Sequence, residues 1–265
     1  MSVTPYLKRQ SGNHYLVTGS GTGIGRAIAL RLAAEGAALS LLARDKSRLE
    51  ETAEAARQAG APAVHVVSAD IRDQRAVDAA MDAAAQALGP FRGIVANSGI
   101  GGPNEPGAGD RFEDIIQTNL MGTYFCMRAA QRNLMAGPDA RHMVVIASIL
   151  GRFGVPGYTG YCASKTALIG LVRAMAQELA GDNIQVNAVC PGWVETQMAR
   201  DGIQGMADGM GISYDEAHAM AMEPVPLGRM SQPHHIAGLV AWLVSADGIG
   251  VTGQGIDMNN GAWMG

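Results

Sequence analysis

The chain has 265 residues, of which 48% are hydrophobic and 17% charged, so it is long and apolar enough to bury a core and is not disordered. A formal net charge of −4 argues against nucleic acid or an anionic membrane as a partner held by bulk charge. Cys126, Cys162 and Cys190 form no CxxC or Cys/His cluster, so we expect reduced cysteines and no metal site. Neither residues 1–12 nor any later run resembles a signal peptide or a membrane span, so we expect a cytoplasmic protein.

Short apolar runs alternate with longer helical patterns along the chain. In chain order, strands are expected at residues 14–18, 38–42, 64–68, 93–96, 142–147, 184–189 and about 254–258. Helices are expected at about residues 23–35, 46–59, 72–88, 112–135, 158–180 and 233–245. This alternation predicts βαβ units in an α/β fold, with a doubly wound parallel sheet of about seven strands and helices on both faces.

No Pro- or Ser-rich linker divides the chain, so residues 1–265 are expected to form a single domain. One long stretch without a clear pattern follows the sixth strand, at about residues 193–229. Unstructured stretches of that length inside a compact domain are usually functional, so we expect a substrate lid there.

A glycine-rich turn, Thr18-Gly19-Ser20-Gly21-Thr22-Gly23-Ile24-Gly25, joins the first strand to the first helix. Bare backbone N–H groups and the helix dipole bind a pyrophosphate at such a place, and glycine lets the phosphates approach. The spacing fits TGxxxGxG rather than GxGxxG, and it resembles the single-domain short-chain dehydrogenase/reductase family. The resemblance implies a Rossmann-like, dinucleotide-binding and catalytic domain. The cofactor contacts expected in this turn are Gly19, Ser20, Thr22, Gly23, Ile24 and Gly25.

The end of the second strand decides which dinucleotide binds. In the family that the sequence resembles, NAD-preferring members carry an acid where this chain has Ala43, and NADP-preferring members often carry a basic residue where it has Arg44. The family's other basic position, in the glycine turn, is Thr22 here. We therefore expect NADP(H) to be preferred while NAD(H) stays possible. Asp45 is expected to cap the next helix.

Three further strand ends match the cofactor cleft of the family, and carboxyl ends of parallel strands are where open α/β sheets bind ligands. In relatives, an acid after the third strand lies against the adenine, and a turn after the sixth strand holds the nicotinamide carboxamide. The contacts that the resemblance implies are Asp70, Ile71, Asn97, Ser98, Gly99, Pro191, Gly192, Val194 and Thr196.

Tyr161 and Lys165 form a YxxxK pair on one face of a predicted helix, so a phenol and an ammonium group can reach a common point. Ser148 ends the fifth strand, and Asn119 matches the family's fourth catalytic position. The resemblance implies that Tyr161 is the acid or base, with Lys165 lowering its pKa and binding the nicotinamide ribose. Ser148 would orient the carbonyl group. Asn119 would hold a relay water at a local break in its helix.

The substrate side is rich in apolar side chains. The residues expected there are Leu150, Phe153, Tyr158, Trp193 and Met198. They predict a largely apolar, cyclic or acyl substrate, as in the 3-oxoacyl and polyketide ketoreductases and cyclic-alcohol dehydrogenases that the sequence resembles. Arg152 is expected to be solvated, with a carboxylate or phosphate partner as the alternative.

The predicted function is hydride transfer between NAD(P)(H) and a carbonyl or secondary alcohol. One alternative is a non-catalytic NAD(P)-binding redox sensor, although such relatives typically lose the Tyr or the Lys. Another is an epimerase or dehydratase, although those relatives carry TGxxGxxG and a longer C-terminal part.

The resemblance also implies a homotetramer. Asn259-Asn260-Gly261 stands where relatives commonly have Gly-Gly, and the sequence gives no reason for this departure.

Overall fold

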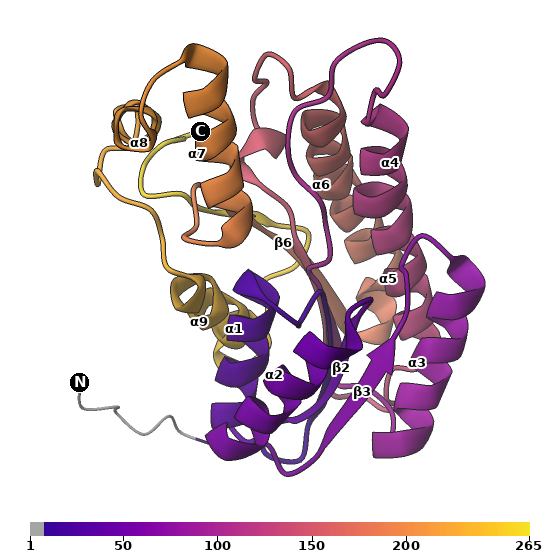
Figure 1. Ribbon diagram of the computed structural model, residues 1–265. Helices are drawn as coiled ribbons and strands as arrows, with labels where there is room; N and C mark the ends of the chain where they lie inside the picture. Colours follow the sequence, from indigo (N-terminus) through magenta and orange to yellow (C-terminus); the bar gives the residue numbers. More distant parts are fainter. Residues whose placement is uncertain (1–7) are drawn as a thin grey trace.

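In the computed structural model, which describes residues 8–265, helices cover both faces of a central parallel sheet (Figure 1). The strand order is β3-β2-β1-β4-β5-β6-β7. The order reverses beside β1, which pairs with β2 on one side and with β4 on the other. The carboxyl ends of β1 and β4 therefore flank the crevice where sheets of this type bind ligands.

The predicted sheet is confirmed within one or two residues at each strand end. The strands are β1 (His14–Thr18), β2 (Ala38–Ala43), β3 (Val64–Ser68), β4 (Gly93–Ala96), β5 (Arg141–Ile146), β6 (Ile184–Pro191) and β7 (Gly255–Met258). The α-helices are α1 (Gly23–Ala34), α2 (Lys46–Ala59), α3 (Gln74–Leu88), α4 (Phe112–Ile116), α5 (Thr123–Arg132), α6 (Thr159–Leu179), α7 (Gln197–Met210), α8 (Tyr214–Met222) and α9 (Pro233–Leu243).

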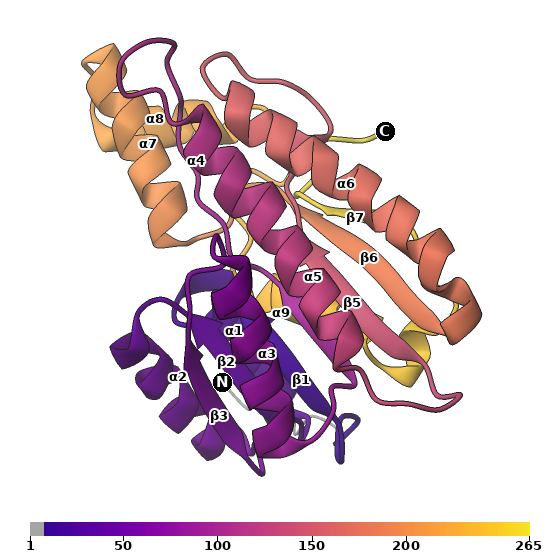
Figure 2. The ribbon, with the colours of Figure 1, turned by 90° about the vertical axis from the view of Figure 1, so that its right-hand side faces the viewer.

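Two apolar cores lie on opposite faces of the sheet. The first joins the strands to α3, α5 and α6, which Figure 2 shows side by side, and the second joins them to α1, α2 and α9. Val144 and Val145 are neighbours in β5 and belong to different cores. Successive side chains of a strand point to opposite faces, so a strand buried on both sides is apolar without alternation.

The long helix expected at residues 112–135 is divided into three parts. A π-helical turn, Gln117–Gly122, separates α4 from α5, and α5 ends at Arg132. Asn119 lies in this turn and is fully buried. A π turn interrupts the regular ladder of backbone hydrogen bonds and is frequent at functional sites. The local break expected at Asn119 is therefore confirmed.

Residues 193–229 are more regular than the sequence indicated. They contain α7 and α8, which pack on each other around Ile203 and Ala217 in a small core of their own. In Figure 1 these two helices stand at one end of the molecule, beyond the carboxyl edge of the sheet. The expectation of an irregular stretch was therefore wrong.

None of the helices within residues 8–265 is both long and apolar enough to cross a bilayer. Residues 1–7, on which part of the expectation about a signal segment depends, lie outside the described residues. The cysteines Cys126, Cys162 and Cys190 are all free.

Candidate active site

The glycine turn leads directly into α1. The N-cap residue, Thr22, makes no side-chain capping bond, so the first N–H groups of α1 stay available to an anion. By contrast, the side chains of Asp45, Asp73, Thr196 and Ser213 cap α2, α3, α7 and α8. A Cβ atom on Gly25 would lie 2.3 Å from the Gly19 oxygen, and Gly19 has a φ of +64°. The turn therefore requires glycine, and its shape fits a pyrophosphate.

Not every residue of this turn presents its side chain to a ligand. The Oγ atom of Ser20 is buried and has no hydrogen-bond partner among the described residues. Thr22 is exposed. We therefore infer that Ser20 would contact a cofactor through its backbone rather than through its hydroxyl group.

Two arginines lie near the end of β2. Arg44 directly follows the strand and is exposed. Asp45 accepts a hydrogen bond from the Arg48 backbone N–H, which confirms it as the N-cap of α2. A Cβ atom on Gly21 would lie 3.1 Å from the Arg48 Cβ, so α2 brings a second cation to the glycine turn. Arg48 was not expected at this site, and its only sign in the sequence is its place in the first turn of α2, shortly after Arg44.

The turn after β4 is fixed by Thr18 at the end of β1. The Thr18 hydroxyl oxygen accepts from the backbone N–H groups of Asn97 and Ser98, both at 3.0 Å. The Asn97 side chain donates to the carbonyl oxygens of Thr18 and Gly19 at 3.1 and 3.2 Å. Asn97 therefore braces the glycine turn from within. Its side chain serves the backbone rather than a ligand.

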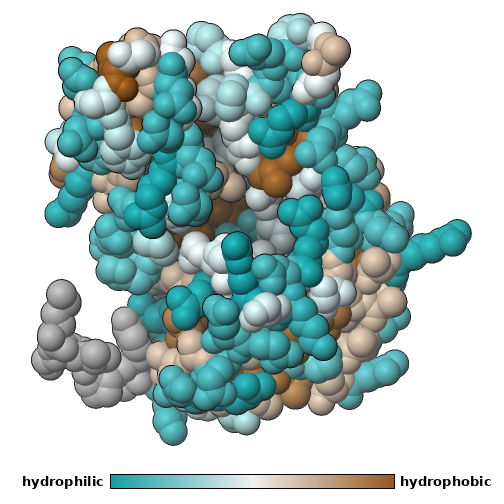
Figure 3. Space-filling view, viewed as in Figure 1, coloured by the Kyte–Doolittle hydropathy of each residue, from teal (hydrophilic) through white to brown (hydrophobic). Residues whose placement is uncertain are grey.

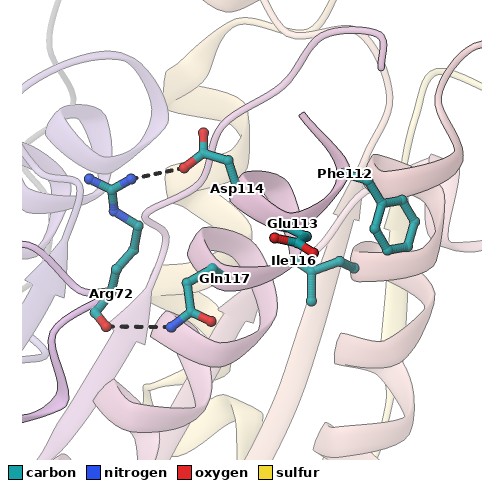
Figure 4. Close-up of a pocket in the computed structure, with 6 residues that line it drawn as sticks. All are labelled: Arg72, Phe112, Glu113, Asp114, Ile116 and Gln117. Carbon is teal, nitrogen blue, oxygen red and sulfur yellow. Dashed lines mark hydrogen bonds and ion pairs between the residues drawn. The ribbon is translucent and has the colours of Figure 1, made fainter. Parts of the chain in front are cut away.

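The acid after β3 is held by an arginine. Asp70 accepts from the Arg72 side chain at 2.6 Å, and Arg72 also donates to Asp114 of α4 at 2.8 Å (Figure 4). The Arg72 hydrogen bond keeps the pKa of Asp70 below its usual range, although partial burial opposes the effect. The hollow drawn in Figure 4, about 410 Å³, is lined by Arg72 and by residues of α4 and its end, and by none of the expected catalytic residues. Ile71 is buried beside Gly122.

Asn119, Gly99 and Lys165 lie together. The Asn119 carboxamide accepts from the Ile100 N–H at 2.8 Å and donates to the Ile100 oxygen at 3.0 Å and to Ser164 Oγ at 3.2 Å. A Cβ atom on Gly99 would lie 3.1 Å from Asn119 Oδ1 and 3.5 Å from Lys165 Nζ. Since the Asn119 side chain is already bonded to protein groups, its backbone is the part left to hold a water.

Ser148 and Tyr161 meet at the end of β5. Ser148 begins a short 3₁₀ turn, Ile149–Gly151, and its Oγ accepts from the Leu150 N–H at 3.1 Å. Burial raises the pKa of the Tyr161 phenol, and the hydrogen bond with Ser148 opposes part of that rise. Lys165 is not among the groups that shift this pKa here, so the lowering expected from Lys165 together with the nicotinamide ring stays a prediction. The phenol is protonated at neutral pH, as a proton donor must be.

Lys165 is nearly fully buried beneath Tyr161. Its Nζ lies 5.5 Å from the centre of the Tyr161 ring and donates to the Ile146 oxygen at 3.0 Å. Burial lowers the pKa of Lys165 to about 8. The structure thus brings Asn119, Ser148, Tyr161 and Lys165 to the carboxyl end of β4 and β5, as the motifs predicted.

The turn after β6 adjoins the glycine turn. A Cβ atom on Gly23 would lie 3.4 Å from Thr196 Cγ2. The Thr196 hydroxyl accepts from the Ala199 N–H at 3.3 Å and donates to the Val194 oxygen at 3.2 Å. Pro191 ends β6, and the Gly192 N–H donates to the Met258 oxygen at 3.2 Å. The turn therefore lies where a dinucleotide would pass, with the Thr196 hydroxyl also capping α7.

Figure 3 shows a hollow between α7 and α8 on one side and α4 on the other. Met198 of α7 is 48% exposed, and a Cβ atom on Gly101 would lie 2.9 Å from its sulfur atom. Phe153 is exposed and Leu150 and Tyr158 are half-buried. Trp193 packs within the small core of α7 and α8. Met198 therefore connects α7 to the loop at Gly101, whereas Phe153 lines a hollow with Cys162 and Thr166 of α6.

Arg152 is not solvated, which corrects the expectation. Its side chain donates to Asp257 Oδ1 at 3.1 Å and to the Gly255 oxygen at 2.6 Å. These bonds tie the loop that follows Ser148 to β7. Neither a substrate carboxylate nor a phosphate is needed to explain this arginine.

Residues 8–265 contain no group of three or more His, Cys, Asp or Glu side chains that could hold a metal ion. His235 accepts a hydrogen bond from the Gln232 N–H at the start of α9, and His234 is exposed. His218 stacks on Tyr214. These histidines have structural or exposed positions.

The chain is similar to known proteins over almost its whole length. Residues 19–262 match the family model described as enoyl-(acyl carrier protein) reductase. The chain is 35% identical over 261 residues to a putative ketoacyl reductase of Streptomyces coelicolor, covering 96% of this chain and 98% of that protein. It is 32% identical over 264 residues to the 3-oxoacyl-acyl-carrier-protein reductase MabA of Mycobacterium tuberculosis, covering 98% and 95%. A solved actinorhodin polyketide ketoreductase variant with NADPH superposes with a TM-score of 0.87 at 33% identity, covering 94% of this chain and 97% of that one.

Proposed function

This chain belongs to the short-chain dehydrogenase/reductase family, and we propose that it reduces the ketone of a 3-oxoacyl thioester to a secondary alcohol. The chain is an oxidoreductase that acts on CH–OH groups and uses NADP(H). The 3-oxoacyl substrate is supported by the names of the relatives, ketoacyl and 3-oxoacyl reductases. The exposed apolar side chain of Met198, in contact with Gly101, suits an apolar substrate.

The observation that carries the proposal is the meeting of Ser148 and Tyr161, with Lys165 Nζ 5.5 Å from the Tyr161 ring. When bound, NADPH supplies a hydride to the carbonyl carbon. Tyr161 gives its phenolic proton to the carbonyl oxygen, and Ser148 donates a hydrogen bond to the same oxygen as negative charge develops there. Lys165 stabilises the resulting phenolate and binds the nicotinamide ribose, and the Asn119 backbone holds the water that returns a proton.

The cofactor contacts follow the strand ends. The glycine turn would hold the pyrophosphate, Arg44 and Arg48 the 2′-phosphate, and the turn from Pro191 to Thr196 the nicotinamide side. Support comes from the uncapped start of α1 and from the contact between Gly23 and Thr196.

We propose that residues 193–229 act as the substrate lid. Their separate core and the contact of Met198 with Gly101 support this role. We also predict that residues 1–265 form one catalytic domain, that the protein assembles as a homotetramer, and that it is located in the cytoplasm.

The direct test is NADPH consumption with the N-acetylcysteamine thioester of acetoacetate, compared with cyclohexanone. The proposal predicts a higher kcat/KM for the thioester. Faster turnover of cyclohexanone would replace the acyl substrate with a cyclic one. Tight NADPH binding without turnover of any ketone would instead support the redox sensor.

A further inference from the structure

The turn that follows β7 carries two asparagines, Asn259 and Asn260, where the resembled family commonly has Gly-Gly. Asn260 has a φ of +57° and Gly261 a φ of +87°. Glycine is the usual residue for the left-handed region, and among residues with a side chain Asn tolerates it best. The hydrogen bonds of Asn260 explain why a residue with a side chain, rather than glycine, occupies this left-handed position.

Asn260 bonds to the segment that leads from α8 to α9, residues 225–229, which we call the return segment. The Asn260 Nδ2 donates to the Arg229 oxygen at 2.7 Å, and the Leu227 N–H donates to the Asn260 oxygen at 3.2 Å. A Cβ atom on Gly261 would lie 2.9 Å from Pro226 Cγ, so the turn and the return segment are in close contact. The end of the chain therefore fastens one end of the α7–α8 unit to β7.

The same turn touches two parts of the candidate active site. Asn259 lies against Gly192, whose Cβ would stand 3.0 Å from the Asn259 Cα. The Asn259 Nδ2 donates to the Trp263 oxygen at 3.1 Å, and the Trp263 ring lies 5.6 Å from the ring of Phe153 in the loop after Ser148. The turn thus connects the return segment, the turn after β6 and the catalytic loop.

We propose that Asn260 is a positioning residue for substrate binding: its amide fixes the return segment, and so sets how α7 and α8 lie over the mouth of the site. This inference rests on the proposed lid. Without the amide the α7–α8 unit is held less firmly, and substrate binding has to order it. KM for the substrate therefore rises. The affinity for NADPH is maintained, because Asn260 does not contact the glycine turn.

The chain offers a closely matched control in Asn183, which directly precedes β6 at the opposite edge of the sheet. Asn183 has a φ of +54°, and its Nδ2 donates to the Pro138 oxygen at 2.7 Å. Asn183→Gly and Asn260→Gly therefore remove the same kind of bond from the same backbone conformation, and glycine adopts that conformation without strain. Only the Asn260 bond reaches the return segment, which leads out of α8.

The measurements are KM and kcat for the acetoacetyl thioester, the Kd of NADPH, and hydrogen exchange of residues 197–222. For Asn260→Gly we expect KM to rise about three- to tenfold, as for one lost hydrogen bond, with little change in kcat or in the Kd of NADPH. Asn260→Asp, which keeps the shape but lacks the donor, should reproduce the rise in KM. Asn183→Gly should leave KM unchanged.

Equal KM values in Asn260→Gly and the wild type, or equal rises in both glycine variants, would overturn the proposal. If the wild type turned over no ketone, the proposed function would fail, and hydrogen exchange would still decide this inference. Faster exchange of residues 197–222 in Asn260→Gly alone would support it, and unchanged exchange would overturn it.

Discussion

The Nζ atom of Lys165 lies 5.5 Å from the centre of the Tyr161 ring and donates to the Ile146 oxygen at 3.0 Å. The ammonium group is thus buried with a carbonyl oxygen and an aromatic ring as neighbours. Burial disfavours the charged form and lowers the pKa of Lys165 to about 8. The residue is therefore mainly charged at neutral pH and loses its charge within a pH range where enzymes are readily assayed.

We predict that kcat/KM for NADPH falls as the pH rises above about 8, because this ratio reports groups of the free enzyme and Lys165 becomes neutral there. Lys165→Arg, which stays protonated, should be less active but should lack this decline. A pH profile from 6 to about 10 checks both variants. An unchanged alkaline limb in Lys165→Arg would assign the decline to another group.

Arg44 should decide the choice of dinucleotide, because it is the cation directly after β2. Arg44→Asp should weaken NADPH binding about tenfold or more, since a charge-assisted contact is lost and the carboxylate repels the 2′-phosphate. NADH binding should be maintained or improved. Fluorescence titrations with both cofactors measure the change.

Two further variants, measured in the same titrations, test whether the effect of Arg44→Asp is specific to its position. Arg48→Asp should act in the same direction, because Arg48 lies beside Gly21 of the glycine turn. Arg57→Asp, in the last turn of the same helix, is the control for added negative charge. Equal effects of all three variants would reject a specific phosphate site.

Ser148 should matter through its hydroxyl group. Ser148→Ala is expected to lower kcat about 10²- to 10³-fold, as for a lost donor to a developing oxyanion, with little change in NADPH affinity. Ser148→Thr keeps a hydroxyl group and should retain much more activity. Steady-state kinetics of both variants test this, and similar losses would point to packing rather than hydrogen bonding.

His142 in β5 should make the fold sensitive to acid. Burial and the nearby Arg92 charge lower the pKa of His142 to about 4, whereas an unfolded histidine titrates near 6.5. Between these values the unfolded state binds the proton and the folded state does not, so stability is lost as the pH falls. By pH 4 the loss from this group reaches about 3 kcal/mol.

Urea unfolding between pH 7 and about 4.5 measures this slope. His142→Gln should flatten it, and His234→Gln, on an exposed site, should leave it unchanged. A slope equal to wild type in His142→Gln would assign the acid sensitivity to other groups.

Much of this arrangement could be predicted from the sequence because local patterns determine it. Unbroken apolar runs specify strands buried on both faces, and motif residues at their carboxyl ends must meet at one edge of the sheet. The break at Asn119 was also predicted, because the resemblance assigns to this residue a water bound by its backbone, and a regular helix leaves no backbone group free for that.

The features that could not be predicted from the sequence depend mostly on contacts between residues far apart in the chain. Arg152 and Asp257 are 105 residues apart, and no local pattern reports their ion pair. The helix α7 was missed because it contains Gly202, Gly205 and Gly209, and glycine has a low helix propensity. Asn260 and its partner Arg229 are 31 residues apart, so no local pattern reports their hydrogen bond either.

The central claim is that Tyr161 protonates the substrate carbonyl beside a bound nicotinamide. The most direct test compares Tyr161→Phe with Tyr158→Phe, which removes a nearby phenol from a half-buried residue. Tyr161→Phe is expected to lower kcat for the acetoacetyl thioester about 10²- to 10⁴-fold while the Kd of NADPH is maintained, and Tyr158→Phe should keep most of the activity. Wild-type turnover in Tyr161→Phe would contradict the claim.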